Sequence, residues 1–290
     1  MNILYSLRLS GKLAIRRLVL IHTIKTLPKP AWSCIKKLSS ILCTLLVAPC
    51  ISLVLFSCST TPDAQSLAQA EAHNTLAYSY LNNGKLNNAF VELQKAIQFD
   101  PENKETLNYL GYISMRFKKY DEAVSYYQKS IAIDPQYSDA RNNLGVAYME
   151  MDQWDEAIEQ FEAALENPTY RTPEKAYTNM GYAYFKTGDF LNAETVLKKA
   201  ETRNPTFTFS MYMLGLVYKA LGDEEAAIAA LDRALKVAPD YIDARWELAQ
   251  AYLRTGDNDK ALLLFEKIAE QAGDTQMGLD AQEYIELIEQ

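Results

Sequence analysis

From residue 70 onward, apolar and polar residues follow one pattern that is repeated six times. Each copy places an alanine after a short polar stretch. Pairs such as Leu144-Gly145, followed by a tyrosine three residues later, keep the same register. The alanines lie 34, 34, 36, 34 and 34 residues apart, at Ala89, Ala123, Ala157, Ala193, Ala227 and Ala261. Random apolar periodicity would not give such constant spacing, so the pattern predicts a tandem repeat.

Glycine, alanine and proline positions predict that each repeat is a pair of helices. Small residues such as Gly111 and Ala123 let two helices approach closely, where a larger side chain would push them apart. A glycine between the helices accepts the positive φ that closes the first helix. Prolines cannot continue a helix, so each marks the passage to the next repeat. The turn glycines are Gly84, Gly188, Gly222 and Gly256, and the prolines are Pro101, Pro135, Pro168, Pro205 and Pro239.

These positions resemble the tetratricopeptide repeat, and the resemblance implies the fold. We expect an all-α protein, a right-handed superhelical solenoid of six helix pairs over residues 70–273. One pair cannot bury its apolar face alone, whereas stacked pairs bury a continuous core. Residues 274–290 are expected to form a capping helix, whose apolar residues would be Met277, Leu279, Ile285 and Leu287.

Members of this family bind other proteins on the concave side of their first helices, so the resemblance implies a partner-binding groove. The residues expected to line it change from amides in the early repeats to aromatic rings in the late ones. They are Asn74, Tyr78, Asn108, Tyr112, Asn142, Tyr182, Tyr212 and Trp246. Tyrosine and tryptophan rings offer apolar area with a polar tip, the composition favoured at contact hot spots.

Two interpretations of the asparagine row remain open at this stage. An amide both donates and accepts, so Asn74, Asn108 and Asn142 could hold the backbone of an extended peptide whatever its side chains. Alternatively, they are solvated polar residues beside ordinary helix packing. On the first interpretation, Asn108→Ala and Asn142→Ala weaken partner binding without lowering the melting temperature. Early unfolding of these variants would indicate structural amides.

The segment before the repeats has the order of an export signal. Eight Lys or Arg residues and no Asp or Glu precede Asp63. An apolar run over residues 41–57 directly follows Lys36 and Lys37, and Pro49 near its middle would weaken a permanent transmembrane helix. We therefore predict a basic leader and signal peptide over residues 1–57.

The end of this run, Leu55-Phe56-Ser57-Cys58, resembles the lipobox of bacterial lipoproteins, with Phe56 bulkier than the usual residue at its place. The resemblance implies cleavage before Cys58, which becomes the lipidated first residue, and a polar tether over residues 58–69. Ser59 after the cysteine implies sorting to the outer membrane, with the body on its periplasmic face. The alternative is a short signal anchor with an incidental cysteine.

The body after the leader is acidic and poor in catalytic side chains. It carries 37 Asp or Glu residues against 21 Lys or Arg residues, a formal net charge of −16, which would repel nucleic acid. Beyond the predicted cleavage point only His73 and Cys58 remain of their residue types, so we expect no catalytic residue, metal site or cofactor. We expect His73 to be a packing residue. The lysine row of chaperone-binding family members is absent from the groove positions.

Two additional residues interrupt the register between the third and fourth repeats. Pro168 and Pro173 bracket Tyr170 and Arg171, which we expect to form an exposed corner that contacts a partner. With the lipobox and six repeats, this junction resembles the tetratricopeptide lipoproteins of type IV pilus assembly, the pilotins. The resemblance implies a scaffold that binds a secretin subunit or another pilus assembly protein and promotes secretin localisation or multimerisation. The alternative is a lipoprotein adaptor that recruits peptidoglycan hydrolases or synthases.

Overall fold

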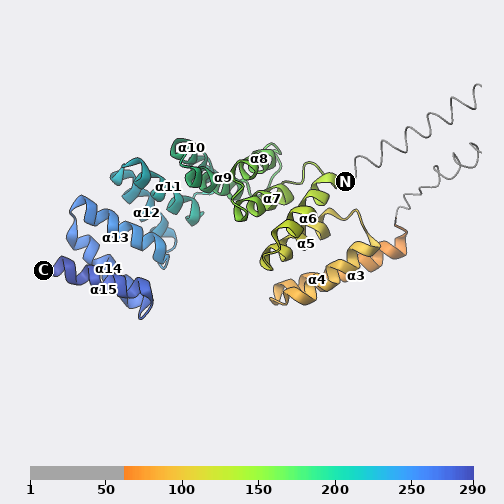
Figure 1. Ribbon diagram of the computed structural model, residues 1–290, viewed down its shortest axis with the longest axis horizontal. Coiled ribbons are helices and arrows are strands. Elements are labelled where there is room, and N and C mark those ends of the chain that lie inside the picture. Colours follow the sequence, from red (N-terminus) through yellow and green to blue (C-terminus); the bar gives the residue numbers. More distant parts are fainter. Residues whose placement is uncertain (1–61) are drawn as a thin grey trace, which may run out of the picture. The chain divides into compact units, whose positions relative to one another are not determined.

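The computed structural model describes residues 62–290, and every regular element within them is an α-helix. The helices are α3 (Ala64–Asn82), α4 (Leu86–Phe99), α5 (Lys104–Arg116), α6 (Tyr120–Ile133), α7 (Ser138–Glu150), α8 (Trp154–Leu165), α9 (Pro173–Thr187), α10 (Phe190–Arg203), α11 (Thr208–Leu221), α12 (Glu224–Val237), α13 (Ile242–Thr255), α14 (Asn258–Ala272) and α15 (Gln276–Glu289). Consecutive helices pack side by side (Figure 1), which confirms the predicted all-α solenoid of helix pairs with a closing helix. The predicted leader and Cys58 lie outside the described residues.

At the close contact between the two helices of each repeat, one helix carries a small residue. A Cβ atom added to Gly111 would lie 2.5 Å from the Tyr127 ring, and one added to Gly145 would lie 2.5 Å from the Phe161 ring. In the fourth and fifth repeats leucines replace these rings: Leu197 lies opposite Gly181, and Leu231 lies opposite Gly215. The glycines are thus required by close helix packing, as predicted.

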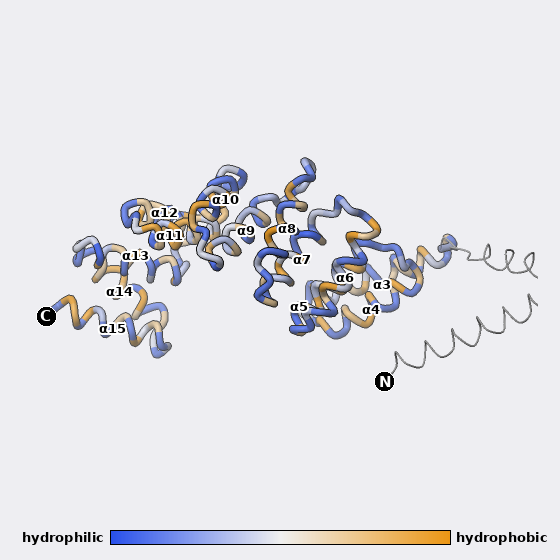
Figure 2. Tube along the Cα trace, turned by 45° about the horizontal axis from the view of Figure 1, so that its top comes forward, coloured by the Kyte–Doolittle hydropathy of each residue, from blue (hydrophilic) through white to orange (hydrophobic). Residues whose placement is uncertain are grey.

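The apolar core runs from one repeat into the next. Met211, Leu231 and Leu248 form one buried cluster, although they come from α11, α12 and α13. Figure 2 shows hydrophobic and hydrophilic residues interspersed along each helix, as expected for helices that bury only part of their surface. No helix in the described part of the chain combines the length and hydropathy that a membrane crossing needs.

Each turn inside a repeat contains a residue with left-handed backbone conformation. In two of these turns the residue is not glycine. Gly84, Gly188, Gly222 and Gly256 have φ between 68° and 81°. Lys118 and Asp152 take the equivalent places in the second and third repeats, with φ of 58° and 57°. A side chain in this region costs conformational energy that glycine avoids.

Two details differ from the sequence-based expectation. Residues 64–69, predicted to belong to the polar tether, are helical instead, because α3 already begins at Ala64, where Asp63 caps it by accepting a hydrogen bond from the Ser66 N–H at 2.7 Å. In α15, Met277 and Ile285 pack on the core, but Leu279 and Leu287 are 45% and 66% exposed. The helical spacing turns these two leucines away from α14, and Ala281, Tyr284 and Ile288 take their place in the core.

Candidate protein-interaction surface

The three asparagines of the predicted amide row join the first helices of successive repeats. Each is 7–8% exposed. Asn74 of α3 accepts a hydrogen bond from Thr106 Oγ1 of α5 at 2.9 Å. Asn142 of α7 accepts one from Asn179 Nδ2 of α9 at 3.1 Å. These amides are therefore part of the contact between repeats, and their Oδ1 atoms are already used.

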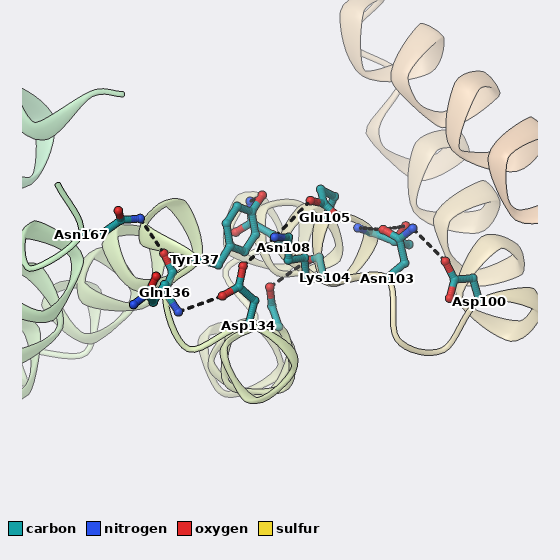
Figure 3. Close-up of polar contacts among 11 residues, drawn as sticks. Asp100, Asn103, Lys104, Glu105, Asn108, Asp134, Gln136, Tyr137 and Asn167 are labelled. Carbon is teal, nitrogen blue, oxygen red and sulfur yellow. Dashed lines mark hydrogen bonds and ion pairs between the residues drawn. The ribbon is translucent and has the colours of Figure 1, made fainter. Parts of the chain in front are cut away.

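Asn108 lies at the centre of the most extensive of these junctions. Its Oδ1 accepts from Asn143 Nδ2 at 2.9 Å, and its Nδ2 donates to the Tyr137 hydroxyl at 3.4 Å. Figure 3 shows the surrounding polar contacts, which include the 2.6 Å ion pair between Lys104 and Asp134. The hydrogen bond from Lys104 lowers the pKa of Asp134, and burial raises the pKa of Tyr137. The Oδ1 and Nδ2 atoms of Asn108 thus each make one hydrogen bond within the protein.

The tyrosines of the early repeats form an aromatic surface beside the amides. Tyr78 packs against Tyr109 with ring centroids 4.9 Å apart, and burial raises its pKa. Tyr112 is 40% exposed and lines a cavity of about 410 Å³ between α5 and α7. Tyr127 and Val146 are apolar lining residues of this cavity, whereas Arg116, Lys118, Asn143 and Glu150 are polar lining residues. Tyr112 is therefore the early-groove ring most open to a partner.

Tyr182 belongs to an aromatic pair that already holds a cation. Its ring lies 6.2 Å from that of Trp154, and Lys186 Nζ lies 5.8 Å from the Trp154 centroid and 6.0 Å from the Tyr182 centroid. These distances are within the range of a cation–π contact. The third and fourth repeats are thereby linked by side chains from α8 and α9.

The last two predicted groove residues are anchored in the core by aromatic neighbours. The Tyr212 ring lies 5.1 Å from that of Tyr241, and burial raises the pKa of Tyr212 to about 12. Trp246 makes edge contacts with Phe265 and Tyr284 at 5.5 and 5.7 Å. The Tyr212 contact joins the fifth and sixth helix pairs, whereas Trp246 contacts its own pair through Phe265 of α14 and the closing helix α15 through Tyr284.

The junction between the third and fourth repeats is not the exposed corner that the sequence suggested. Tyr170 packs against the cluster that contains Phe161 and Met180, and burial raises its pKa to about 12. Only Arg171 of the pair is exposed. The two added residues give the loop enough length to fold the Tyr170 ring onto the core, which the proline positions alone did not reveal.

His73 holds the two helices of the first repeat together. Its Nδ1 lies 2.6 Å from Glu92 Oε2, and its ring stacks on Phe99 at 5.7 Å. Hydrogen bonds from Lys95 and from His73 lower the pKa of Glu92. The geometry is that of a packing residue. Within residues 62–290 no group of three His, Cys, Asp or Glu side chains is placed to hold a metal ion.

Several contact residues were not identified from the sequence. Thr106, Asn143 and Asn179 supply the hydrogen bonds to the asparagine row, and Tyr241 and Tyr284 supply the late aromatic contacts. The signal that could have found two of them is the Asn142-Asn143 pair, echoed by Thr178-Asn179 one repeat later. A polar residue next to the expected groove position can face the neighbouring helix.

Six stacked helix pairs, four of them with glycine at the close helix contact, define a class of all-α scaffold proteins that act through their surfaces. The tetratricopeptide repeat family matches residues 74–138, 142–206 and 212–275, and a second tetratricopeptide repeat family matches residues 114–169. Because the first of these matches covers more than half of the chain, the protein belongs to the tetratricopeptide repeat family.

Solved structures of similar fold include two pilus proteins. The type IV pilus biogenesis factor PilW is 20% identical with a TM-score of 0.69, and the match covers 73% of this chain and 98% of PilW. PilF of Pseudomonas aeruginosa is 17% identical with a TM-score of 0.68, and the match covers 76% of this chain and 99% of PilF. At these identities the likeness shows the fold alone.

A curated relative matches over a shorter segment. A probable UDP-N-acetylglucosamine–peptide N-acetylglucosaminyltransferase SEC of Arabidopsis thaliana is 27% identical over 96 residues. That segment is 33% of this chain and only 10% of the plant protein. The similarity is therefore confined to a small part of the relative.

Proposed function

We propose that this protein is a lipid-anchored scaffold for type IV pilus assembly on the periplasmic face of the outer membrane. It binds a partner such as a secretin subunit and promotes the partner's localisation or multimerisation. The observation that carries the proposal is the extent of the structural match, because 98–99% of the PilW and PilF chains superpose on this solenoid. The array thus has the same extent as theirs, in contrast to the partial match with the plant enzyme.

The sequence and the surface both agree with an adaptor role. The lipobox-like end of the leader would hold the array beside the membrane through Cys58, because several acyl chains together anchor a protein firmly. Tyr112 of the second repeat and Trp246 of the sixth each line a cavity. An adaptor of this kind needs only an anchor and a binding surface.

The anchor is tested by fractionating membranes from cells that produce Cys58→Ala. We expect this variant to leave the outer-membrane fraction, because it cannot be acylated. Cys50→Ala is the matched control, since it removes a cysteine from the same apolar run without touching the predicted acylation site. Retention of Cys58→Ala in the outer-membrane fraction would contradict the lipid anchor.

The partner is tested in membranes from cells that lack the protein. We expect secretin subunits to accumulate as monomers there, and to form multimers again when the wild-type protein is restored. Crosslinking followed by purification of the protein should recover secretin subunits. Recovery of peptidoglycan hydrolases or synthases with normal secretin multimers would instead support the cell-wall adaptor.

A further inference from the structure

One side of α15 lines a cavity with a residue of α13. Four residues of α15 share one side of the helix, because they are three or four residues apart: Asp280, Glu283, Tyr284 and Leu287. Tyr284 is partly buried against the core, whereas Leu287 is 66% exposed. This side of α15 faces Trp246 of α13, and the five residues line a cavity of about 530 Å³.

The aromatic walls of this cavity are held in place by the core beneath them. Tyr284 stacks on Phe265 with ring centroids 4.7 Å apart and an interplanar angle of 3°. Phe265 is fully buried and also contacts the Trp246 ring edge at 5.5 Å. Because Phe265 fixes both rings, the cavity does not have to be assembled when a ligand binds.

The charge around the cavity has a single sign. Its two ionisable lining residues besides Tyr284 are Asp280 and Glu283, and α15 carries four carboxylates and no Lys or Arg. Asp280 Oδ1 accepts a hydrogen bond from Gln276 Nε2 at 2.7 Å, which leaves its charge uncompensated because the donor is neutral. Residues 241–290 contain eleven Asp or Glu residues against four Lys or Arg residues. The field at this end of the array therefore attracts cations.

We propose that the cavity binds an arginine side chain from a segment of the partner protein. A guanidinium is planar and stacks on aromatic faces, and its N–H groups match carboxylate oxygens. The partly buried rings of Trp246 and Tyr284 and the exposed Leu287 offer apolar contact to the aliphatic stem, while Asp280 and Glu283 offer acceptors. A lysine would lose both the stacking and the paired geometry. This inference rests on the proposed function only in that the protein must have a protein partner.

The test uses full-length protein in detergent and a fluorescently labelled Leu-Arg-Leu peptide, with binding followed by anisotropy. The comparison peptide carries citrulline, which keeps the shape of arginine but lacks its charge. We expect the arginine peptide to bind and the citrulline peptide to bind at least about threefold more weakly. Glu283→Gln and Asp280→Asn should each weaken binding of the arginine peptide by about threefold to tenfold.

Glu286→Gln is the matched control, because it removes the same charge from the same helix but does not line the cavity. It should bind the arginine peptide within about twofold of the wild type. Absence of binding by the wild type, equal binding of the citrulline peptide, or an equal loss in Glu286→Gln would each overturn the proposal. A wild-type dimer that Glu283→Gln dissolves would overturn it as well, since a second copy would then occupy the cavity. Secretin recovery from membranes is independent of these outcomes, so the proposed function can stand when this site fails.

Discussion

The contacts between the first helices of neighbouring repeats differ in chemistry between the early and the late part of the solenoid. In the first half, buried asparagines join neighbouring first helices through hydrogen bonds, as in the Asn142–Asn179 contact at 3.1 Å. In the second half the asparagine row ends and aromatic pairs such as Tyr212–Tyr241, at 5.1 Å, make these contacts, as the Tyr78–Tyr109 pair also does between the first two repeats. The helical register is the same in both halves, so the repeat fixes where a contact is made but leaves its chemistry free.

This difference has an energetic consequence. A net hydrogen bond contributes about 0.5–1.5 kcal/mol to stability, whereas burying a large apolar side chain contributes about 1.5–3 kcal/mol. In a repeat array, stability is approximately the sum of the repeats and of the interfaces between neighbours. We therefore expect the amide-joined half to open at lower denaturant concentration than the aromatic-joined half.

The largest effect is expected from Tyr212→Ala. The substitution removes a half-buried ring from two core clusters and from the Tyr241 contact, so it should lower the free energy of unfolding by about 2–3 kcal/mol. The measurement is urea denaturation followed by circular dichroism.

Tyr212→Phe serves as the control, because it keeps the ring and removes only the hydroxyl. We expect a change below about 0.5 kcal/mol for this variant. If Tyr212→Phe were as unstable as Tyr212→Ala, the hydroxyl and not the ring would join the late repeats, and the contrast between the halves would be lost.

The next effect compares close helix contacts in the two halves through Gly215→Ala and Gly145→Ala. The new Cβ would lie 2.6 Å from Leu231 Cγ in the first variant and 2.5 Å from Phe161 Cε1 in the second. Each should cost about 1–3 kcal/mol. Gly215→Ala should cost more, because Leu231 Cγ lies next to its backbone, whereas the far end of the Phe161 ring can tilt away. Thermal unfolding of the two variants in parallel decides the order, and a larger loss for Gly145→Ala would refute this reasoning.

A smaller effect is expected where the early repeats use amides. Asn142→Ala removes the acceptor for Asn179 Nδ2 between α7 and α9, so it should lower the free energy of unfolding by about 1 kcal/mol. The hydrogen bonds thus favour the structural interpretation of the amide row, on which the melting temperature falls. A double-mutant cycle with Asn179→Ala should give a coupling energy of about 0.5–1.5 kcal/mol. A cycle that pairs Asn142→Ala with Tyr212→Ala should be additive, and coupling there would show that the halves are not independent.

The sequence predicted the repeat and its close contacts well but could not assign the amides. The spacing of glycines and alanines reports helix packing directly, and the close approach expected at the small residues is found at Gly111 and Gly145, where the opposing rings are Tyr127 and Phe161. Asn108, by contrast, occupies a position from which an amide can face either the groove or the next helix. Its orientation depends on Tyr137 and Asn143, which belong to the following repeat. Such pairing is a property of the stacked array and cannot be obtained from one repeat alone.

The packing of Tyr170, in the loop between the third and fourth repeats, could not be predicted from the sequence either. Tyr170 stands between two prolines in a polar stretch, which is typical of an exposed turn. The ring nevertheless packs against the cluster around Phe161, because the two added residues let the loop fold back. The sequence could show that the register breaks there, but the direction of the side chain depends on the path of the loop.

The smallest effects are expected at the turns, where the second and third repeats differ from the other four. Lys118 and Asp152 have positive φ in the second and third repeats, while glycine holds this place in repeats four to six. Lys118→Gly should raise the free energy of unfolding by about 0.5–1 kcal/mol, because relief of the left-handed strain exceeds the added entropy of the unfolded chain. Asp152→Gly should gain less, since aspartate tolerates this conformation better than lysine does.

The reverse change in the late half completes the comparison. Gly222→Ala introduces a side chain at φ 77° with no atom within 4 Å of the new Cβ, so any loss of stability reports backbone strain alone. We expect a loss of about 1 kcal/mol in urea denaturation. Opposite signs for Lys118→Gly and Gly222→Ala would show that the turns of the second and third repeats carry strain that the glycine turns avoid. Stabilisation by Gly222→Ala would mean instead that the entropy of the unfolded chain outweighs strain at these turns.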